Sequence, residues 1–451
     1  MGTLPPFPDS FVWGVATSSF QIEGAAVEDG KGLSIWDAFC RQPGAIADQS
    51  DGDIACDHYH RWEQDLDLIT SLGVDAYRFS VSWPRVRPGG SGAWNNKGLD
   101  FYERVVDGLL ERKVKPYLTL NHWDLPLELQ AAGGWAHRDT VQRFVEYAEG
   151  IQARMGDRLA AITTHNEPWV MSVLGHETGV FAPGIKDRGV AMQVAHHLML
   201  SHGLALQALR AQGASAKLGI VLNLSPTHSA TESSDDRAKA HLEDGRLLRW
   251  YMDPLFKACY PADVLEFLGG DSPQMQDGDL QAIATPMDFL GINYYSRSVV
   301  SASTSWTAKD SGYDLTDMGW EVYPEGLTEL LLRLQRDYPV PPLYITENGG
   351  AFKDAVVDRR IHDNQRSEYI ASHIAAVADA IAQGVRMEGY MVWSLLDNFE
   401  WASGHEKRFG IVHVDYATQR RTLKDSALWY QGFLQRQKAA RGQRAMFAQG
   451  A

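Results

Sequence analysis

The chain has 451 residues, of which 44% are hydrophobic and 22% charged, as is typical of a globular protein. Its formal net charge is −15, from 42 basic and 57 acidic side chains, and such an acidic surface repels phosphate backbones, so nucleic acid is not an expected partner. Residues 1–10 lack the basic and apolar segments of a signal peptide, and no apolar run approaches the roughly 18 residues of a membrane span, so no membrane partner is expected either.

The cysteines and short motifs narrow the class of protein further. Cys40, Cys56 and Cys259 are odd in number and widely spaced, which fits neither a disulfide framework nor a metal-binding pattern. A reducing cytoplasm is therefore the expected location. No dinucleotide fingerprint, phosphate-binding loop or His-Glu-x-x-His motif is present, and the His58/His60 pair has no further ligand at metal spacing. We therefore expect no cofactor and no metal.

Short β-rich runs alternate with helical stretches along the whole chain, and the apolar runs suit strands that are buried on both faces. Eight such strands alternating with helices predict a closed (β/α)8 TIM barrel, a fold that reaches more than about 400 residues when its βα loops are extended. We therefore expect residues 1–451 to form one catalytic domain. The expected strands are Phe11–Ser19, Asp75–Trp83, Lys115–His122, Ala160–Glu167, Lys217–Leu224, Met287–Tyr295, Leu343–Glu347 and Glu388–Leu396.

The segments between the strands show helical periodicity or none. Ser301–Trp320 is polar and aperiodic, which predicts a long loop over the barrel mouth. Residues from about 437 to 451 are polar and small, so we expect a frayed tail there. Apolar periodicity, with Gly73 and Gly384 as stop signals, predicts helices over Tyr59–Leu72, Thr140–Met155, Val190–Gln212 and Asn364–Gln383.

Polar and aromatic residues are concentrated where five of these strands end. Any one such end could be a turn, because Asn, Asp and Gly favour turns for local reasons. Active sites of these barrels, however, lie at the C-terminal ends of the strands, so five together indicate a functional site. The five segments are Asn121–Asp124, Asn166–Trp169, Asn293–Tyr295, Glu347–Gly349 and Asp397–Trp401.

Glu167 and Glu347 are two candidate catalytic carboxyl groups. Each follows an apolar run and is followed within two residues by a chain-breaking residue, Pro168 or Gly349. Glycoside hydrolysis needs such a pair, one protonated and one ionised. An isolated glutamate at a strand end is more often solvated or ion-paired than catalytic. The pair therefore allows this chemistry without establishing it.

The segments Thr164–Pro168 and Ile345–Gly349 resemble the two signature motifs of glycoside hydrolase family 1, the β-glucosidase family. The resemblance covers nearly the whole chain in the expected order. It implies a retaining β-glucosidase that removes the terminal non-reducing β-D-glucosyl residue of β-glucosides and cello-oligosaccharides such as cellobiose, through a covalent glycosyl-enzyme. Further matching segments are Phe11–Gly24, Tyr77–Trp83, Asn121–Pro126, Phe289–Tyr295, Trp393–Trp401 and Arg408–Gly410.

The resemblance assigns roles to the residues around the glutamates. Glu167 would be the general acid/base and Glu347 the nucleophile, which must stay ionised. Arg78 and Tyr295 would support that ionised form. Asn166 would bind the 2-hydroxyl of the sugar, an interaction that strengthens in the transition state.

The family's sugar pocket also maps onto this sequence. Amide, imidazole and carboxyl groups can bind pairs of hydroxyls, and indole rings stack on the CH face of a pyranose. Trp393 would be the stacking platform, and the other substrate-binding positions would be Gln21, His122, Trp123, Asn166, Asn293, Trp320, Glu400, Trp401 and Phe409. Trp169, Leu174 and Asn223 fall at the entrance, where a narrow neck would give tolerance to the product glucose. Trp13, Trp36 and Trp62 are expected to be structural.

Two positions refine the expected substrate. Family members acting on 6-phosphoglycosides replace the acidic residue at Glu400, so its presence favours unphosphorylated sugars. Phe181 stands where the family commonly has histidine, which predicts a more apolar entrance.

The sequence leaves alternative functions open. The same pocket would serve β-galactosides or β-fucosides, and transglycosylation depends on water access that the sequence does not reveal. A non-catalytic sugar-binding protein would need neither glutamate, and thioglycosidases typically carry glutamine at the acid/base position, so Glu167 and Glu347 argue against both. A homo-oligomer is one arrangement that the sequence leaves open.

Overall fold

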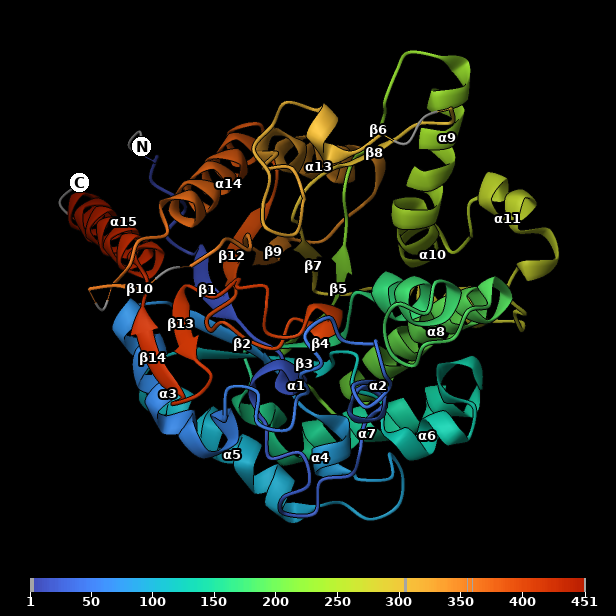
Figure 1. Cartoon of the computed structure of the whole chain (residues 1–451), viewed down its shortest axis with the longest axis horizontal. Coiled ribbons are helices and arrows are strands. Elements are labelled where there is room, and N and C mark those ends of the chain that lie inside the picture. The colour runs from blue at the N-terminus through green and yellow to red at the C-terminus, as the bar shows by residue number, and fades with distance from the viewer. Residues whose placement is uncertain (1–3, 304–305, 355, 359, 450–451) are drawn as a thin grey trace.

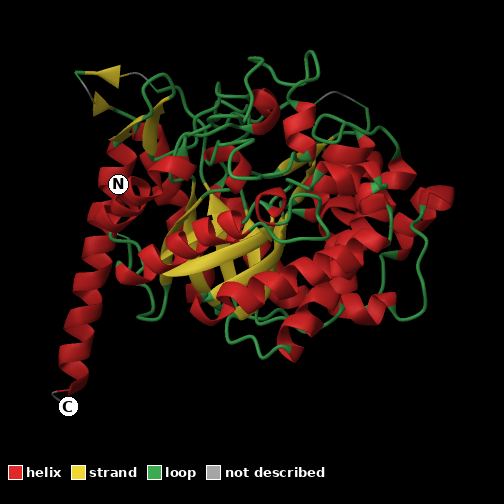
Figure 2. Ribbon diagram, turned by 90° about the horizontal axis from the view of Figure 1, so that it is seen from below, coloured by secondary structure: helices red, strands yellow, loops and turns green. Residues whose placement is uncertain are grey.

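The computed structural model describes residues 4–303, 306–354, 356–358 and 360–449. Within these residues, parallel strands close into an eight-stranded barrel in the order β1-β12-β9-β7-β5-β4-β3-β2. Figure 2 shows the barrel at the centre, surrounded by helices, and the predicted (β/α)8 fold is confirmed. Each barrel strand overlaps a predicted one: β1 (Val12–Ala16), β2 (Ala76–Ser80), β3 (Lys115–Asn121), β4 (Ala161–Asn166), β5 (Lys217–Asn223), β7 (Phe289–Asn293), β9 (Leu343–Asn348) and β12 (Met387–Trp393).

Long helices connect successive barrel strands and cover the outside of the barrel (Figure 1). The four predicted helices are present, and the first ends where Gly73 adopts a left-handed φ of 78°. The helices of this layer are α3 (His58–Leu72), α5 (Asn96–Glu111), α7 (Asp139–Met155), α8 (Arg188–Ala211), α13 (Pro324–Asp337), α14 (Asn364–Ala382) and α15 (Asp425–Gln449).

Shorter elements occupy the long loops between the barrel strands. The connection from β5 to β7 is the most elaborate and carries α9 (Ser234–Asp244), α10 (Trp250–Lys257), α11 (Ala262–Leu268) and α12 (Asp279–Ile283). The other short helices are α1 (Ser19–Ile22), α2 (Ile35–Phe39), α4 (Trp83–Val86) and α6 (Leu127–Ala131). Paired short strands outside the barrel are β6 (Thr227–Ser229) with β8 (Ser298–Val300), β10 (Val356–Val357) with β11 (Arg360–Ile361), and β13 (Val412–Asp415) with β14 (Arg420–Leu423).

The core lies in and around the barrel because its strands are apolar on both faces. All five residues of β1, β2 and β7 are buried. Trp13 on β1 is a core residue, as expected, with its ring centroid 4.8 Å from that of Phe433 on α15. The barrel thus provides a rigid frame on which the strand ends are held.

The segment expected to be a long loop is irregular over most of its length. Within Ser301–Trp320 the structure describes one turn of 3-10 helix, Ala308–Asp310, and a bridge from Leu315 to Glu321 just beyond. Residues 304 and 305 of that expected loop lie outside the described residues.

A frayed tail was predicted after Arg436. This prediction is wrong for residues 437–449, because they continue α15 as helix. Gln437 ties this helix to the start of the chain: its Oε1 accepts from the Phe7 amide at 3.1 Å, and its Nε2 donates to the Pro5 carbonyl at 3.1 Å. Gln, Lys, Arg and Ala are common in polar tails but are also good helix formers, so composition alone did not distinguish a tail from a helix. Residues 450 and 451 lie outside the described part.

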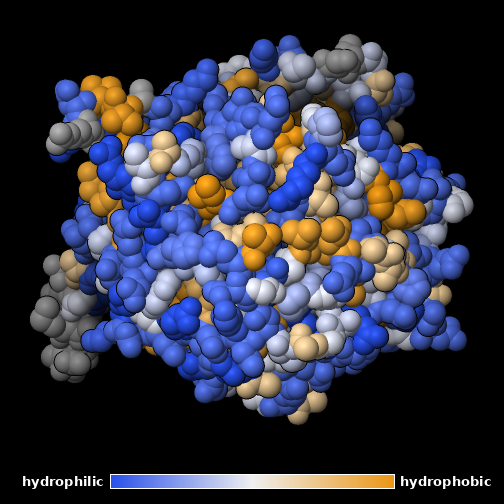
Figure 3. All heavy atoms as spheres, turned by 60° about the horizontal axis from the view of Figure 1, so that its bottom comes forward, coloured by the Kyte–Doolittle hydropathy of each residue, from blue (hydrophilic) through white to orange (hydrophobic). Residues whose placement is uncertain are grey.

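The face shown in Figure 3 is mostly hydrophilic, with apolar side chains in small separate groups. No helix among the described residues is long and apolar enough to cross a membrane.

Candidate active site

The strands that carry the two glutamates are both irregular just before those residues. Between Thr163 and Asn166, β4 advances three residues while its neighbour β5 advances two. Between Ile345 and Glu347, β9 advances two residues while β7 advances one. Such bulges re-aim side chains and are common beside active sites. Glu167, the residue after β4, has a φ of 52°, a left-handed conformation that non-glycine residues adopt mainly where the surroundings impose it.

Glu347 is paired with a cation. Arg78 on β2 donates from Nη1 to Glu347 Oε1 at 2.5 Å, and the Tyr295 hydroxyl donates to Oε2 at 2.7 Å. Arg78 is 2% exposed and Glu347 3% exposed, so water screens this pair little. Burial raises the pKa of Glu347, while the Arg78 guanidinium and the Tyr295 hydroxyl oppose that rise. With these partners, Glu347 rather than Glu167 is the glutamate that carries the negative charge.

Glu167 has a different environment. Its Oε1 accepts a hydrogen bond from Asn293 Nδ2 at 2.5 Å, and no ion pair joins it to a basic side chain among the described residues. Asn293 is itself oriented by Thr346, whose hydroxyl donates to its Oδ1 at 2.8 Å. Burial, and then the charge of Glu347, raise the pKa of Glu167 to about 8. At neutral pH this carboxyl is therefore largely protonated.

Asn166 and His122 form a network whose hydrogen positions can be deduced. Arg78 Nη2 donates to Asn166 Oδ1 at 2.7 Å, which turns the Asn166 amide nitrogen toward His122 Nε2 at 3.0 Å. That ring nitrogen must accept, so His122 carries its proton on Nδ1. Burial, and then the Arg78 charge, lower the pKa of His122 well below its usual value, which keeps the ring neutral. Its Nδ1 is buried without a hydrogen-bond partner among the described residues.

Gln21 and Glu400 form a second polar contact in the site. Gln21, on α1, is 0% exposed, and its Nε2 donates to the Phe399 carbonyl at 2.9 Å and to Glu400 Oε2 at 3.4 Å. Burial, and then Glu347, raise the pKa of Glu400 to about 8. A largely protonated Glu400 would not repel a phosphate by charge. No ion pair joins Glu400 to a described basic side chain, so a phosphate there would lack a cation beside it.

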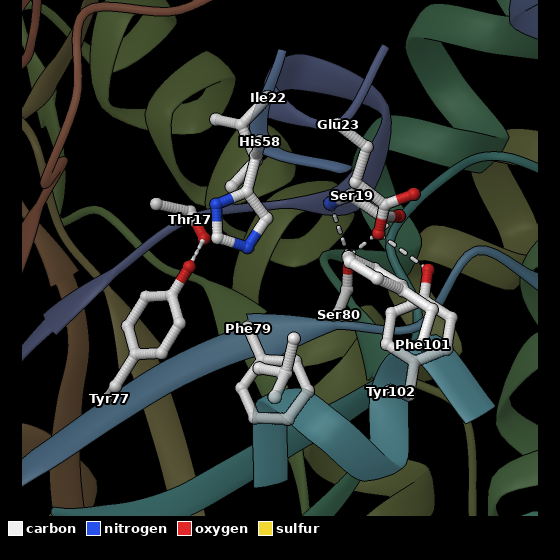
Figure 4. Close-up of a pocket in the computed structure, with 11 residues that line it drawn as sticks. Thr17, Ser19, Ile22, Glu23, His58, Tyr77, Phe79, Ser80, Phe101 and Tyr102 are labelled. Carbon is white, nitrogen blue, oxygen red and sulfur yellow. Dashed lines mark hydrogen bonds between the residues drawn. The ribbon is translucent and has the colours of Figure 1, made fainter. Parts of the chain in front are cut away.

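Figure 4 shows contacts that hold the segment around α1, the short helix to which Gln21 belongs. The Ser19 amide donates to Ser80 Oγ on β2 at 2.7 Å, and the Tyr102 hydroxyl donates to Glu23 at 2.5 Å. The cavity among these residues has a volume of only about 10 Å³. That is space for a single water molecule at most, so this cavity serves the packing of α1 and is too small for a sugar.

Aromatic rings form one wall of the site. The His122 ring is nearly parallel to those of Trp393 and Trp401, with interplanar angles of 18° and 15°. Trp36 was expected to be structural, and its ring centroid lies 4.6 Å from that of Trp401, so it backs this wall. Gly349 follows β9, and a Cβ there would lie 1.7 Å from the Trp393 carbonyl oxygen. Only glycine fits such a close approach, which brings the end of β9 against the aromatic wall.

A cavity of about 270 Å³ opens from these residues toward the surface, and a substrate could enter through it. Phe181, the departure from the family pattern, lies in its wall with its ring centroid 5.8 Å from that of Trp123. The cavity brings together ten of the predicted site residues: Trp123, Glu167, Trp169, Leu174, Asn223, Asn293, Tyr295, Trp320, Glu400 and Trp401.

The other predicted residues adjoin this cavity through direct contacts. Phe409 is buried and packs against two lining residues, with its ring centroid 6.0 Å from that of Tyr295 and 6.2 Å from that of Trp320. The hydrogen bonds and ring contacts described above connect the remainder: Gln21, Arg78, His122, Asn166, Glu347 and Trp393.

Several residues that line the cavity were not predicted from the sequence: Val170, Ser225, Ser296, Arg297 and Met318. Ser296 and Arg297 directly follow Tyr295, so extending that strand-end segment by two residues would have found them. Ser225 likewise follows Asn223 closely. Met318 lies inside the long irregular loop, where no pattern marks it.

The His58/His60 pair has partners that explain it without a metal. His58 Nδ1 lies 2.8 Å from Asp65 Oδ2, and His60 Nδ1 lies 2.6 Å from Asp57 Oδ1. Among the described residues, no group of three or more His, Cys, Asp or Glu side chains could hold a metal ion.

Comparisons with known proteins give a consistent result. The profile of the family described as glycosyl hydrolase family 1 matches residues 4–439. The chain is 47% identical to β-glucosidase A of Acetivibrio thermocellus over 94% of this chain and 97% of that protein. It superposes on a β-glucosidase from Exiguobacterium antarcticum with a TM-score of 0.94, at 43% identity and with 97% and 100% of the two chains covered. For the Thermotoga maritima β-glucosidase in complex with isofagomine lactam, the TM-score is 0.93 at 43% identity, with 96% and 100% covered.

Proposed function

Because the chain belongs to glycosyl hydrolase family 1 and is a retaining β-glucosidase, we propose that Glu167 is its acid/base and Glu347 its nucleophile. The observation that carries this assignment is the difference between their surroundings. Glu347 is bonded to the Arg78 cation and the Tyr295 hydroxyl, whereas Glu167 is bonded to the neutral Asn293 amide. A nucleophile must be ionised and a general acid protonated, and these partners favour that division.

The first step of the reaction follows from this division of charge. A carboxylate oxygen of Glu347 attacks the anomeric carbon while Glu167 gives its proton to the departing glycosidic oxygen, which leaves a covalent glucosyl-enzyme. As Glu347 forms its ester, it loses the negative charge that Arg78 had balanced. The negative charge of Glu347 also contributes to the raised pKa of Glu167, so the pKa of Glu167 falls once the intermediate has formed.

The second step uses the same residues in reverse. Glu167, now ionised, takes a proton from a water molecule that attacks the anomeric carbon, and Glu347 leaves as a carboxylate. The two inversions give net retention of the β-configuration. Asn166 would bind the 2-hydroxyl throughout, because its side chain is fixed by Arg78 and His122 beside both glutamates.

The glucosyl residue would bind in the deep part of the site. Gln21 and Glu400 would bind hydroxyls on one side, and the His122 Nδ1–H, which lacks a protein partner, would donate to a hydroxyl on another. Trp393 would stack under the CH face of the pyranose. The remaining cavity, toward Trp320, would take the aglycone, and we propose cellobiose and short cello-oligosaccharides as substrates.

We propose that Trp169, Leu174 and Asn223, which line the cavity, form a narrow neck that limits rebinding of glucose. We propose in addition that the whole chain acts as one catalytic domain, which the contacts of Gln437 on α15 with the first residues support.

A cytoplasmic location is supported by the three free thiols.

The acid/base assignment is tested by leaving-group dependence in Glu167→Ala. On cellobiose, whose leaving group needs a proton, activity should fall by about 10³ to 10⁴-fold. On 2,4-dinitrophenyl β-D-glucoside, which leaves without one, the variant should release a rapid burst of phenol and then turn over slowly. Azide should accelerate that slow phase and give the β-glucosyl azide, which is identified by NMR.

The control is Glu266→Ala, which removes an exposed glutamate on α11 and should behave as the wild type on both substrates. Equal losses on cellobiose and on the activated glucoside, without a burst, would contradict the role of Glu167.

A further inference from the structure

An arginine lies on the outer side of the cavity, away from the residues assigned to the glucosyl group. Arg297 follows the strand end that carries Tyr295, and it lines the same cavity as Glu167 and Trp320. Among the described residues that line this cavity, it is the only Lys or Arg side chain. A cation at this position cannot be explained by the catalytic network, since Arg78 already neutralises Glu347.

The guanidinium of Arg297 is held rigidly. Its Nε donates to Glu321 Oε2 at 2.6 Å, and its Nη1 donates to His228 Nδ1 at 3.1 Å. The Tyr323 ring centroid lies 4.1 Å from its Cζ, which is stacking distance. Nη2 makes no hydrogen bond to any residue that the structure describes. The side chain is 15% exposed, so this remaining donor group stays accessible to a ligand.

The supports of Arg297 are themselves fixed. Glu321 is 2% exposed, and its second oxygen has no hydrogen-bond partner among the described residues. His228 Nε2 lies 3.0 Å from Glu329, so this nitrogen donates and Nδ1 is left to accept from Arg297. The result is a chain from Glu329 through His228 and Arg297 to Glu321. Such a chain preorganises a cation and lowers the entropy cost of binding an anion to it.

Apolar surface lies beside this cation. Trp320 directly precedes Glu321, is 36% exposed and lines the cavity together with Met318. Its ring centroid lies 5.5 Å from that of Tyr295, the residue that bonds Glu347. An aromatic group leaving from the reaction centre would therefore contact Trp320 and extend toward Arg297.

We propose that the outer cavity is a subsite for aromatic aglycones that carry a carboxylate, such as hydroxybenzoate glucosides, and that Arg297 is the residue that selects them. The remaining Nη2 group of the guanidinium can donate a charge-assisted hydrogen bond to a carboxylate, and it would bind a neutral carboxamide less strongly. This inference rests on the proposed function, because it takes the cavity beside Glu167 as the substrate site.

The test compares two substrates that differ at one group, 4-carboxyphenyl and 4-carbamoylphenyl β-D-glucoside. The ratio of their kcat/KM values is measured in the wild type and in Arg297→Met, so that the different leaving-group abilities cancel. Removing a charge-assisted hydrogen bond should lower the ratio by about tenfold. Arg297→Lys keeps the charge and should restore most of the ratio.

Two further variants distinguish selection of the carboxylate by Arg297 from two other effects, which are the unpaired charge left on Glu321 and the general loss of a positive charge. Arg297→Met leaves Glu321 unpaired, so the double variant Arg297→Met/Glu321→Gln removes that charge as well and should show the same lowered ratio. Arg188→Met is the matched control, because Arg188 also pairs with a carboxylate, Asp271, and also lies over a ring, Phe267. Its ratio should stay at the wild-type value.

The outcomes distinguish this inference from the proposed function. If all variants hydrolyse p-nitrophenyl β-D-glucoside normally but the ratio is the same in wild type and Arg297→Met, the carboxylate subsite is refuted and the catalytic assignment stands. An equal fall of the ratio in Arg188→Met would also refute it. If Glu167→Ala fails its own test, the cavity is not the substrate site and the inference falls with it.

Discussion

The inner and outer halves of the cavity are built in different ways. Inner residues lie on the barrel strands or close after them and are almost wholly buried, as with Arg78 at 2%, His122 at 1% and Trp393 at 3% exposure. Outer residues lie on the long loops, and Trp320 there is 36% exposed. The difference suggests that the barrel fixes the chemistry, while the loops decide which aglycone is accepted.

Hydrogen bonding sharpens this comparison. Each polar side chain of the inner half has at least one fixed protein partner, and Asn166 contacts both Arg78 and His122. Such a network cannot relax around a missing member, so substitutions there should have large effects. Outer residues mostly present apolar surface, and substitutions there should act mainly through substrate choice.

The largest effect in this comparison is expected for Arg78→Met. Breaking a buried ion pair should lower kcat/KM by about a thousandfold. Without the cation, the pKa of Glu347 rises, so the limb of the pH profile at low pH should move to higher pH. In the wild type, activity should fall as the pH decreases through the pKa of Glu347, and also as it increases through about 8, where Glu167 loses its proton.

The measurement is kcat/KM against pH for p-nitrophenyl β-D-glucoside. Arg158→Met, which removes a surface arginine, is the control and should keep the wild-type profile. An unshifted low-pH limb in Arg78→Met would contradict the pairing of Arg78 with the ionised nucleophile.

A smaller effect is expected for Gln21→Ala, about tenfold to a hundredfold in kcat/KM, because hydrogen bonds to sugar hydroxyls are lost. Gln21 also supports Phe399 and Glu400, so a merely structural role must be separated from binding. Monodeoxy glucosides do this. The variant should lose discrimination against at least one of them, whereas a uniform loss on all would point to a structural role. Gln435→Ala, at an exposed glutamine on α15, is the control.

The same division explains what could be predicted from the sequence. The strands and the inner residues were predictable because a strand end such as Asn166–Glu167 has a fixed place in a barrel, and the family motifs coincide with those ends. Met318 was missed because a side chain inside a long loop is positioned by contacts with other loops, which leave no local pattern. Arg297 was missed because the segment at the end of β7 was taken to stop at Tyr295, two residues earlier. The tail after Arg436 was predicted wrongly because helix-forming polar residues resemble a disordered end.

The smallest effect is expected at the entrance. Leu174→Ala widens the neck and should change kcat/KM for p-nitrophenyl β-D-glucoside by less than about threefold, since no hydrogen bond is lost. Glucose should rebind more easily, so its inhibition constant should fall. Leu428→Ala, at an exposed leucine on α15, is the control. A wild-type inhibition constant for glucose no higher than the Michaelis constant of the substrate would contradict a neck that limits rebinding.

The central claim, that Glu347 is the nucleophile held ionised by Arg78 and Tyr295, is tested most directly in Glu347→Gly. Hydrolysis of p-nitrophenyl β-D-glucoside should fall by several orders of magnitude, because the covalent step is removed. Added azide should partly restore phenol release and, by entering where the carboxylate stood, give the α-glucosyl azide. Near-normal activity in Glu347→Gly, or a β-configured azide product, would contradict the assignment.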